Sequence, residues 1–410
     1  MLRRSSSFPP RLLRSVLALN DSGDQKTDVE AGTGIVVDVR IVRTQEEFSQ
    51  IKPQWEELLA SLDPVPLPLT HAWLLSWWRA FANDREMEFR CVYRGAELVG
   101  AAPFYRSREL FRGVPVTLLK LAANGHTPFS GVIVTPALNR AERETVLSAL
   151  TRVGYKEIGQ FLKIHQYGEL KRFIVEYPTS PKSNVGIKPG LTTPVIWIDQ
   201  DWDTFFSSRT KKLKKSLKHK LNRFNKEPGF TITEKKISST EDPIVPEIIQ
   251  ISANSWKAGI GNDLKSHHRS RQFLFNLIES FGRSGLLSAW MIHHGKTPVA
   301  FELHLAYDGI VYPIRADYDE AFKAFSPGSV LEYSALKHLF KTGLVRQYYT
   351  CADDYWYLSN WTTEYEEFCT VEVFGGGAKT RFLYALEYKL IPIVKRLIGK
   401  PVKTSVCSRR

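Results

Sequence analysis

Between residues 286 and 316, three runs of mainly apolar residues alternate with short polar turns. The runs are Leu286–His293, Pro298–Ala306 and Ile310–Ala316, and the turns between them contain Gly295 and the pair Asp308-Gly309. Asp-Gly between two apolar runs is a strong signal for a tight hairpin. We therefore predict an antiparallel meander of three strands.

A loop, a helix and a fourth strand follow this meander. The loop is Phe325–Ser329, and the apolar positions of Val330–Lys341 then recur at helical spacing. Gly343 is a typical helix end, and Val345–Thr350 returns to the pattern of a strand. Backbone N–H groups at the start of a helix are unpaired and lie at the positive end of its dipole, so this loop is suited to bind a phosphate.

The first part of the chain shows a similar order of elements. Strand Ile35–Val42, a helix from about Glu46 and a helix capped by Thr70 precede a hairpin of Phe89–Tyr93 and Glu97–Tyr105. Tryptophans at helical spacing in the second of these helices indicate a buried core rather than a base-stacking surface. This half has no Pro-Gly loop before a helix, so we predict two similar units of which only the second holds a phosphate loop.

These patterns divide the chain into five predicted segments. Residues 1–34 are polar, rich in arginine and serine and poor in acids, which is typical of a disordered tail or of an organelle transit peptide. Residues 35–177 and 195–385 are the two α/β units. Residues 178–194, rich in Pro, Ser, Gly and Thr, are predicted to be the linker between them. Residues 386–410 are predicted to be a basic amphipathic tail.

Length and cysteine content narrow the class of protein. The chain has 410 residues, enough for two cores, and no run of about 18 apolar residues that would span a membrane. Its four cysteines, Cys91, Cys351, Cys369 and Cys407, form no CxxC pair. We therefore expect free thiols in a reducing compartment, no bound metal and a cytoplasmic location.

The net charge of +13 is concentrated on one predicted helix. Its cations are Arg209, Lys211, Lys212, Lys214, Lys215, Lys218, Lys220, Arg223 and Lys226. A basic surface attracts anions such as nucleotides, nucleic acid, acidic glycans or lipid headgroups. The alternative is a solvated helix face above buried Leu213, Leu217, Leu221 and Phe224, which recur about every four residues.

A second basic amphipathic segment is Tyr388–Lys403. Its apolar positions are Leu390, Ile391, Ile393, Val394, Leu397 and Ile398, and its cations include Lys389, Lys395, Arg396 and Lys400. Such a helix either makes a peripheral contact with an anionic membrane or docks on the core of its own protein.

Three passages resemble a known family over roughly residues 40–385. They are Trp55–Leu58 with Thr70–Trp78 and Gly100–Phe104, the basic helix Arg209–Lys226 ending in Pro228-Gly229-Phe230, and Ser326-Pro327-Gly328 with Ala352–Trp361. The chain is similar here to the GNAT superfamily of acyl-CoA N-acyltransferases, and within it to acetyltransferases associated with the cellulose-biosynthesis protein CelD. The doubled unit also resembles the Fem-type aminoacyltransferases of cell-wall synthesis.

This resemblance implies an α/β fold with mixed (α+β) sheets and two tandem GNAT-like domains. The first domain is then a degenerate copy that shapes the site without holding the cofactor. Acetyl-CoA or another acyl-CoA is the implied co-substrate, with no metal. Strand Ile310–Ala316 would splay from Val345–Thr350, which makes Arg315, Ala316 and Asp317 the implied edge for the pantetheine arm.

The same resemblance assigns the phosphate contacts. The implied N–H donors to the pyrophosphate are Ser326, Gly328, Ser329 and Val330, with Lys323 as a mobile charge. The family usually carries a Tyr-Lys pair after the last core strand, where this chain has Tyr357 and Leu358. Leu358 therefore stands where the family places a substrate contact.

Acyl transfer from a thioester requires an oriented acceptor, removal of its proton and stabilisation of the charging carbonyl oxygen. Glu302 and His304 lie two apart on one predicted strand, so they share a face and form a candidate general base. The alternative is a half-exposed strand whose polar face meets water. The resemblance adds Asp354 as a catalytic candidate, and Tyr349 is the candidate acid toward the thiolate or, alternatively, a structural tyrosine.

Three functions fit these observations. The first is transfer of an acetyl or acyl group from acyl-CoA to an amine or hydroxyl, with polysaccharide or cell-envelope synthesis implied by resemblance. The second is a Fem-type transferase that uses aminoacyl-tRNA. We do not expect nucleic acid as a partner, because the basic helix lacks the interleaved aromatics of single-strand binding sites. The third is a catalytically degenerate scaffold or membrane-surface partner, favoured by Leu358.

Overall fold

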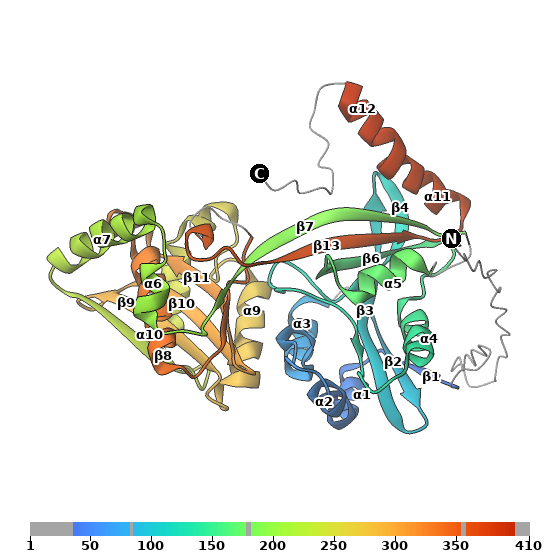
Figure 1. Cartoon of the computed structure of the whole chain (residues 1–410), viewed down its shortest axis with the longest axis horizontal. Helices are drawn as coiled ribbons and strands as arrows, with labels where there is room; N and C mark the ends of the chain where they lie inside the picture. The colour runs from blue at the N-terminus through green and yellow to red at the C-terminus, as the bar shows by residue number, and fades with distance from the viewer. Residues whose placement is uncertain (1–35, 83–84, 178–181, 354–357, 398–410) are drawn as a thin grey trace, which may run out of the picture.

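A computed structural model describes residues 36–82, 85–177, 182–353 and 358–397. Its strands form one mixed sheet that runs through both halves of the chain (Figure 1). The strands are β1 (Asp38–Val42), β2 (Glu86–Arg94), β3 (Glu97–Phe111), β4 (Val114–Leu121), β5 (Ile133–Val134), β6 (Glu157–His165), β7 (Asn184–Trp197), β8 (Phe230–Lys236), β9 (Leu287–His294), β10 (Thr297–Tyr307), β11 (Ile310–Tyr318), β12 (Gln347–Tyr349) and β13 (Tyr365–Phe374). The order across the sheet is β1-β2-β3-β4-β6-β13-β7-β12-β11-β10-β9-β8, and β5 pairs with β3.

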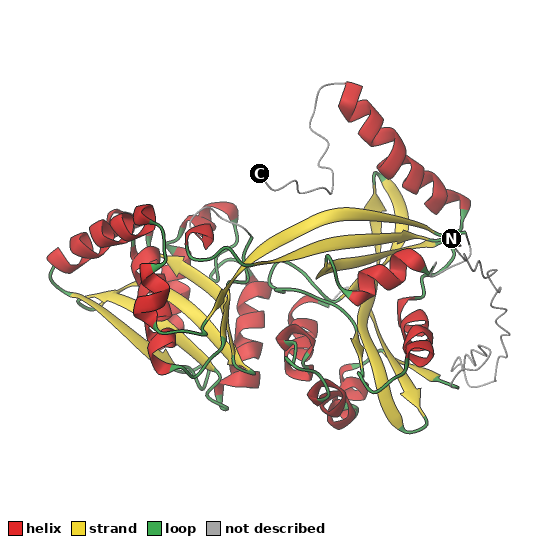
Figure 2. Ribbon diagram, in the orientation of Figure 1, coloured by secondary structure: helices red, strands yellow, loops and turns green. Residues whose placement is uncertain are grey.

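Helices cover both faces of this sheet (Figure 2). They are α1 (Gln45–Gln50), α2 (Lys52–Ala60), α3 (His71–Phe81), α4 (Arg140–Thr151), α5 (Glu169–Glu176), α6 (Trp202–Ser207), α7 (Lys211–Lys226), α8 (Ile244–Ala253), α9 (His268–Leu277), α10 (Pro327–Thr342), α11 (Ala378–Ala385) and α12 (Ile391–Leu397). No helix in the described part of the chain is long and apolar enough to cross a membrane.

The helices of the first half form the predicted tryptophan-rich core. Thr70 caps α3 as predicted, because its hydroxyl accepts a hydrogen bond from the Trp73 backbone N–H at 3.2 Å. Trp73 and Trp77 are fully buried, which confirms the prediction that these tryptophans belong to the core. The single helix predicted from Glu46 is two helices, because Pro53 lies in the first turn of α2, a position that proline tolerates.

The meander of the second half is confirmed. Strands β9, β10 and β11 pair antiparallel in sequence order. Asp308 and Gly309, at the β10–β11 turn, have φ values of 48° and 72°. These left-handed values are the ones a tight two-residue hairpin requires. Helix α10 follows and ends at Gly343 with φ 60°, as predicted.

The segment predicted as a linker is instead most of strand β7. This strand pairs with β13 over nearly its whole length and with β12 at its end, so it joins the two halves of the sheet. The proline and glycine that suggested a loop lie at an irregularity in the β7–β13 pairing. A Cβ on Gly190 would lie 2.8 Å from the Phe368 carbonyl oxygen, so the close approach of the two strands requires glycine there.

The two halves share a continuous core on one face of the sheet. Helix α3 packs against α9, with the Trp73 and Phe273 rings 5.2 Å apart. The Asn276 side-chain amide donates to the Ser76 carbonyl at 3.0 Å across the same contact. Helices α8 and α9 therefore lie on this face, whereas α6, α7 and α10 pack together on the opposite face.

Candidate active site

Strands β11 and β12 separate soon after they begin. They pair at only two positions, Ile310 with Gln347 and Val311 with Tyr348. Strand β12 stays paired with β7, whereas β11 continues to Tyr318 paired with β10 alone. Among the described residues, the edge of β11 beyond Val311 therefore has no strand partner on the β12 side.

The predicted phosphate loop lies at the amino end of α10. Ser326 adopts a left-handed conformation with φ 54°, and α10 begins at Pro327. The Ser329 and Val330 amides both donate to the Ser326 carbonyl, and the Ser326 amide donates to Lys323 O. Three of the four N–H groups expected to face a pyrophosphate are thus used in closing this turn. Within the described residues, only the Gly328 amide of the four has no acceptor.

Two cations of the basic helix reach this loop. The Lys220 ammonium lies 2.8 Å from the Ser329 hydroxyl, and the Arg223 guanidinium donates to the Ala324 carbonyl at 2.5 Å. Burial lowers the pKa of Lys220, and the nearby Glu332 carboxylate acts in the opposite direction. Positive charge is therefore placed beside Gly328 by α7, an element far from it in the sequence.

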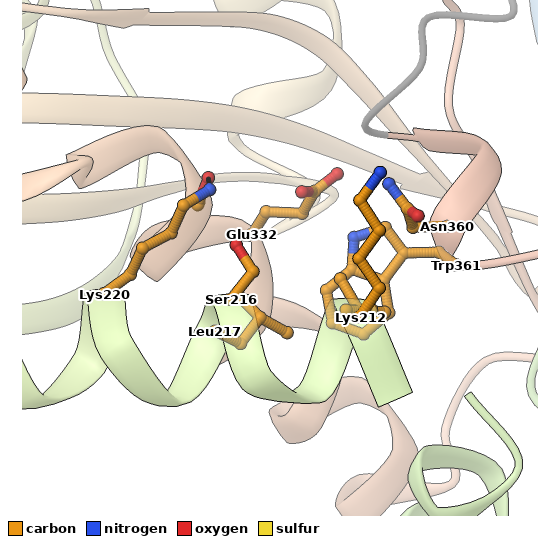
Figure 3. A pocket seen from close by; sticks show the side chains of 9 residues that line it. Lys212, Ser216, Leu217, Lys220, Glu332, Asn360 and Trp361 are labelled. Atoms are coloured by element: carbon orange, nitrogen blue, oxygen red, sulfur yellow. Dashed lines mark hydrogen bonds between the residues drawn. The ribbon is translucent and has the colours of Figure 1, made fainter. Parts of the chain in front are cut away.

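A small pocket opens between α7 and α10 (Figure 3). Its cavity volume is about 50 Å³. The lining residues are Lys212, Leu213, Ser216, Leu217, Lys220, Ser329, Glu332, Asn360 and Trp361. A cavity of this size holds a group of a few atoms, whereas whole-ligand pockets measure about 300–1,000 Å³. A larger ligand would have to extend out of the pocket along the protein surface.

Glu332 is the carboxylate of this pocket, and sequence reasoning missed it. Burial, and next the negative charge of Glu302, raise the pKa of Glu332 to about 8. A hydrogen bond from Trp361 and the charge of Lys220 oppose this rise. Glu332 lies three residues after Ser329 on α10, so the two side chains are on the same face of the helix. This spacing is the feature of the sequence that could have placed Glu332 beside the phosphate loop.

Behind the pocket, Glu302 and His304 are in direct contact. His304 Nε2 lies 2.7 Å from a Glu302 carboxylate oxygen, and the Tyr348 hydroxyl donates to the same oxygen at 2.5 Å. All three side chains are buried, so this strand does not present a polar face to water. Burial and the Glu302 charge raise the pKa of Tyr348 well above its usual range, which keeps its hydroxyl protonated as a donor.

Tyr349 does not join this group. Successive residues of a strand point to opposite faces, and Tyr348 takes the face of Glu302. Tyr349 instead packs against Phe129 and Tyr312 on the other face of the sheet. The tyrosine beside Glu302 and His304 is therefore Tyr348, and the prediction of Tyr349 was wrong by one residue.

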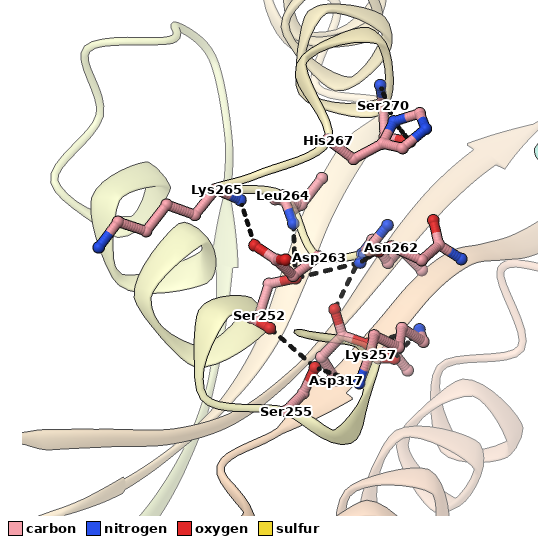
Figure 4. Close-up of polar contacts among 12 residues, drawn as sticks. Ser252, Ser255, Lys257, Asn262, Asp263, Leu264, Lys265, His267, Ser270 and Asp317 are labelled. Atoms are coloured by element: carbon pink, nitrogen blue, oxygen red, sulfur yellow. Dashed lines mark hydrogen bonds and ion pairs between the residues drawn. The ribbon is translucent and has the colours of Figure 1, made fainter. Parts of the chain in front are cut away.

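Arg315 and Asp317 also lie on the opposite face, where they form an ion-pair cluster with Lys257. Figure 4 shows Asp317 beside Lys257. Arg315 Nε donates to the Asp317 carboxylate at 2.9 Å, and the Lys257 ammonium contacts the same carboxylate at 2.5 Å. Lys257 also donates to the Ala316 carbonyl at 2.9 Å. Of the three residues predicted to line the cofactor, Arg315 and Asp317 are thus paired with each other. Ala316 is the one that is exposed.

The remaining predicted residues do not gather at the pocket. Lys323 is exposed and forms an ion pair with Glu320 at 3.3 Å. Asp354 lies outside the described residues. Leu358 is buried. No group of three or more His, Cys, Asp or Glu side chains in the described ranges has a geometry that could hold a metal ion.

The raised pKa of Glu332 predicts how stability changes with pH. Between its ordinary pKa of 4.5 and about 8, the folded chain retains a proton that the unfolded chain has released. The free energy of unfolding therefore falls as pH rises through this window, and the contribution is fully present only below it. Glu332→Gln cannot ionise, so its pH profile should be flatter.

Urea unfolding between about pH 5 and 9 measures this slope. Glu241→Gln, at an exposed position, is the matched control and should follow the wild-type curve. Identical slopes for wild type and Glu332→Gln would contradict a protonated Glu332 in the folded state.

A family model described as the acetyltransferase (GNAT) domain matches residues 211–358, which run from the start of α7 past β12. The long mixed sheet and this match confirm the predicted α/β class. The C-terminal half of the chain therefore contains a segment that matches a GNAT acetyltransferase domain.

Several solved structures are similar over most of the chain. The C-terminal domain (DUF2156) of a putative lysylphosphatidylglycerol synthetase from Agrobacterium fabrum is 10% identical, with a TM-score of 0.49, covering 84% of this chain and 97% of that one. FemX is 12% identical, with a TM-score of 0.48 and coverages of 82% and 98%. A tandem GNAT protein from the clavulanic acid biosynthesis pathway is 12% identical, with a TM-score of 0.46 and coverages of 83% and 99%. No curated protein matches the chain.

Proposed function

We propose that this protein transfers an acyl group from an acyl-CoA thioester to an amine or hydroxyl. The observation that carries this proposal is the separation of β11 from β12 beside the amino end of α10. Among the described residues it leaves the edge of β11 beyond Val311 without a strand partner, although the Ala316 carbonyl accepts a hydrogen bond from Lys257. The Gly328 amide, the Ser329 hydroxyl and the Lys220 ammonium lie at the neighbouring end of α10. An extended amide-bearing arm can pair with such an edge, and a pyrophosphate suits the adjoining donors.

The pocket supplies the proton chemistry in this proposal. The acyl donor is already reactive, so the protein has to orient the acceptor and take its proton. Glu332 is the carboxylate among the residues that line the pocket, and its pKa of about 8 is close to physiological pH. Glu302, held by Tyr348 and His304, raises that pKa through its charge and is a positioning residue.

Binding of acetyl-CoA tests the donor. At about 100 times Kd the ligand should stabilise the fold by about 2.7 kcal/mol, seen as a rise in Tm. Lys220→Met and Gly328→Trp should each remove most of this shift. Lys220→Met deletes the cation proposed to bind the phosphate, and Gly328→Trp fills the space next to the Gly328 amide.

Lys218→Met is the matched control, since Lys218 lies on the same helix and is exposed. The control should retain the full shift. Absence of a shift with every acyl-CoA tested, or equal loss in Lys218→Met and Lys220→Met, would count against the proposed site.

The resemblance described above suggests a sugar amine or hydroxyl of polysaccharide or envelope synthesis as the acceptor. A second candidate donor is aminoacyl-tRNA, favoured by the basic helix. Among the described residues, no cation of α7 forms an ion pair with a carboxylate, so this helix presents unneutralised charge. Binding of charged tRNA that weakens steeply with salt, without an acyl-CoA shift, would select this alternative.

A further inference from the structure

Residues 378–397 form one continuous helical arm made of α11, a π-helical turn (Leu386–Leu390) and α12. Its first half is docked on the protein. Leu383 is fully buried, Glu387 accepts a hydrogen bond from Arg112 at 2.5 Å, and the Tyr388 hydroxyl donates to Glu372 at 2.8 Å. The arm is therefore docked on the protein's own core as far as Tyr388, which is one of the two alternatives stated for the basic tail.

The second half of the arm leaves the protein. Helix α12 has no buried residue, and it projects beyond the sheet at the upper right of Figure 1. Four large apolar side chains here are at least half exposed: Leu390 (50%), Ile393 (54%), Val394 (53%) and Leu397 (80%). Their spacing of i, i+3, i+4 and i+7 places them on one helical face. An exposed apolar stripe of this kind marks an interaction surface.

The arm that carries this stripe is also positively charged. The exposed cations of the arm are Lys379, Arg381, Lys389, Lys395 and Arg396. None of them pairs with a carboxylate within the described residues, whereas the acid of the same arm, Glu387, is neutralised by Arg112 and Lys188. A hollow of about 380 Å³ adjoins the base of the stripe and includes Arg381, Lys389 and the exposed ring of Phe382.

We propose that this arm docks the protein on an anionic lipid surface. The Leu390–Leu397 stripe enters the apolar region, and Arg381 and Lys389 meet lipid phosphates at the hollow. Apolar burial combined with cation–headgroup attraction is the means by which amphipathic helices bind membranes peripherally. A second copy of the chain fits this surface less well, because a symmetric contact through α12 would bring like charges from both copies together.

Vesicle flotation of the full chain tests the proposal. Wild type should float with vesicles of phosphatidylglycerol and phosphatidylcholine but not with pure phosphatidylcholine. Ile393→Glu/Val394→Glu should lower the affinity by about tenfold or more, because two inserted apolar groups become charged. Both residues are exposed, so the fold should be preserved.

Leu344→Glu is the matched control, since Leu344 is 82% exposed elsewhere on the surface. It should bind as wild type does. Arg381→Gln/Lys389→Gln should weaken binding to the anionic vesicles and reduce its salt dependence.

Three outcomes would overturn the proposal. One is no binding to anionic vesicles. Another is binding that survives Ile393→Glu/Val394→Glu but is lost in Lys215→Gln/Lys218→Gln, which would assign it to the basic helix. The third is dimerisation in analytical ultracentrifugation, abolished by the same double glutamate variant, without vesicle binding. That result would make a second copy the occupant of the stripe.

Discussion

Replacing Asp317 with alanine is expected to lower the free energy of unfolding by about 3–5 kcal/mol. The Asp317 side chain is fully buried and lies against two cations, the Arg315 guanidinium and the Lys257 ammonium. Removing the carboxylate leaves both charges desolvated without their counter-ion. Burial already lowers the pKa of Lys257, and Asp317 is the main influence opposing that shift.

Urea unfolding followed by tryptophan fluorescence measures the effect. Asp199→Ala, at an exposed position, is the matched control and should change stability by less than about 0.5 kcal/mol. Asp317→Asn keeps an oxygen that accepts hydrogen bonds, so its stability should lie between those of Asp317→Ala and Asp199→Ala. Equal stability of the Asp317→Ala and Asp199→Ala proteins would show that the cluster does not depend on this carboxylate.

Replacing Glu332 with glutamine is expected to lower the rate of acyl transfer by about 10²–10⁴-fold, the usual contribution of a positioned general base. Glutamine has nearly the same shape as glutamate but cannot accept a proton. The wild-type rate should rise with pH to a plateau above about 8, where Glu332 is ionised. Steady-state release of the free CoA thiol, measured with a panel of amine and hydroxyl acceptors, gives both the rate and the pH profile.

Two further variants make this result specific. Glu241→Gln should leave both the rate and the profile unchanged. Glu302→Gln removes a charge that raises the pKa of Glu332, so the midpoint of its pH–rate profile should move to lower pH. A Glu332→Gln enzyme with wild-type activity, or a Glu302→Gln enzyme with an unshifted midpoint, would exclude the roles proposed for these residues.

Local signals in the sequence were enough to predict the elements around the site. The three apolar runs and the Asp308-Gly309 turn define the meander, because a two-residue hairpin needs left-handed residues. Gly343 ends α10 for the same conformational reason, and Thr70 caps α3 through its own hydroxyl. The contact between Glu302 and His304 also follows from spacing on one strand. In each case the interacting groups are close in the chain, so the pattern itself carries the information.

The composition of the pocket depends on contacts between distant parts of the chain. Lys220 and Glu332 share the pocket only because α7 packs against α10. Trp361, which follows β12 in the chain, lines the same pocket. The choice of Tyr348 over Tyr349 depends on which face of β12 meets Glu302, and strand alternation alone leaves that face undetermined. Strand β7 was mistaken for a linker because its proline and glycine gain their role only when β13 lies beside them. Periodicity therefore determined the elements, and long-range packing determined which side chains share a site.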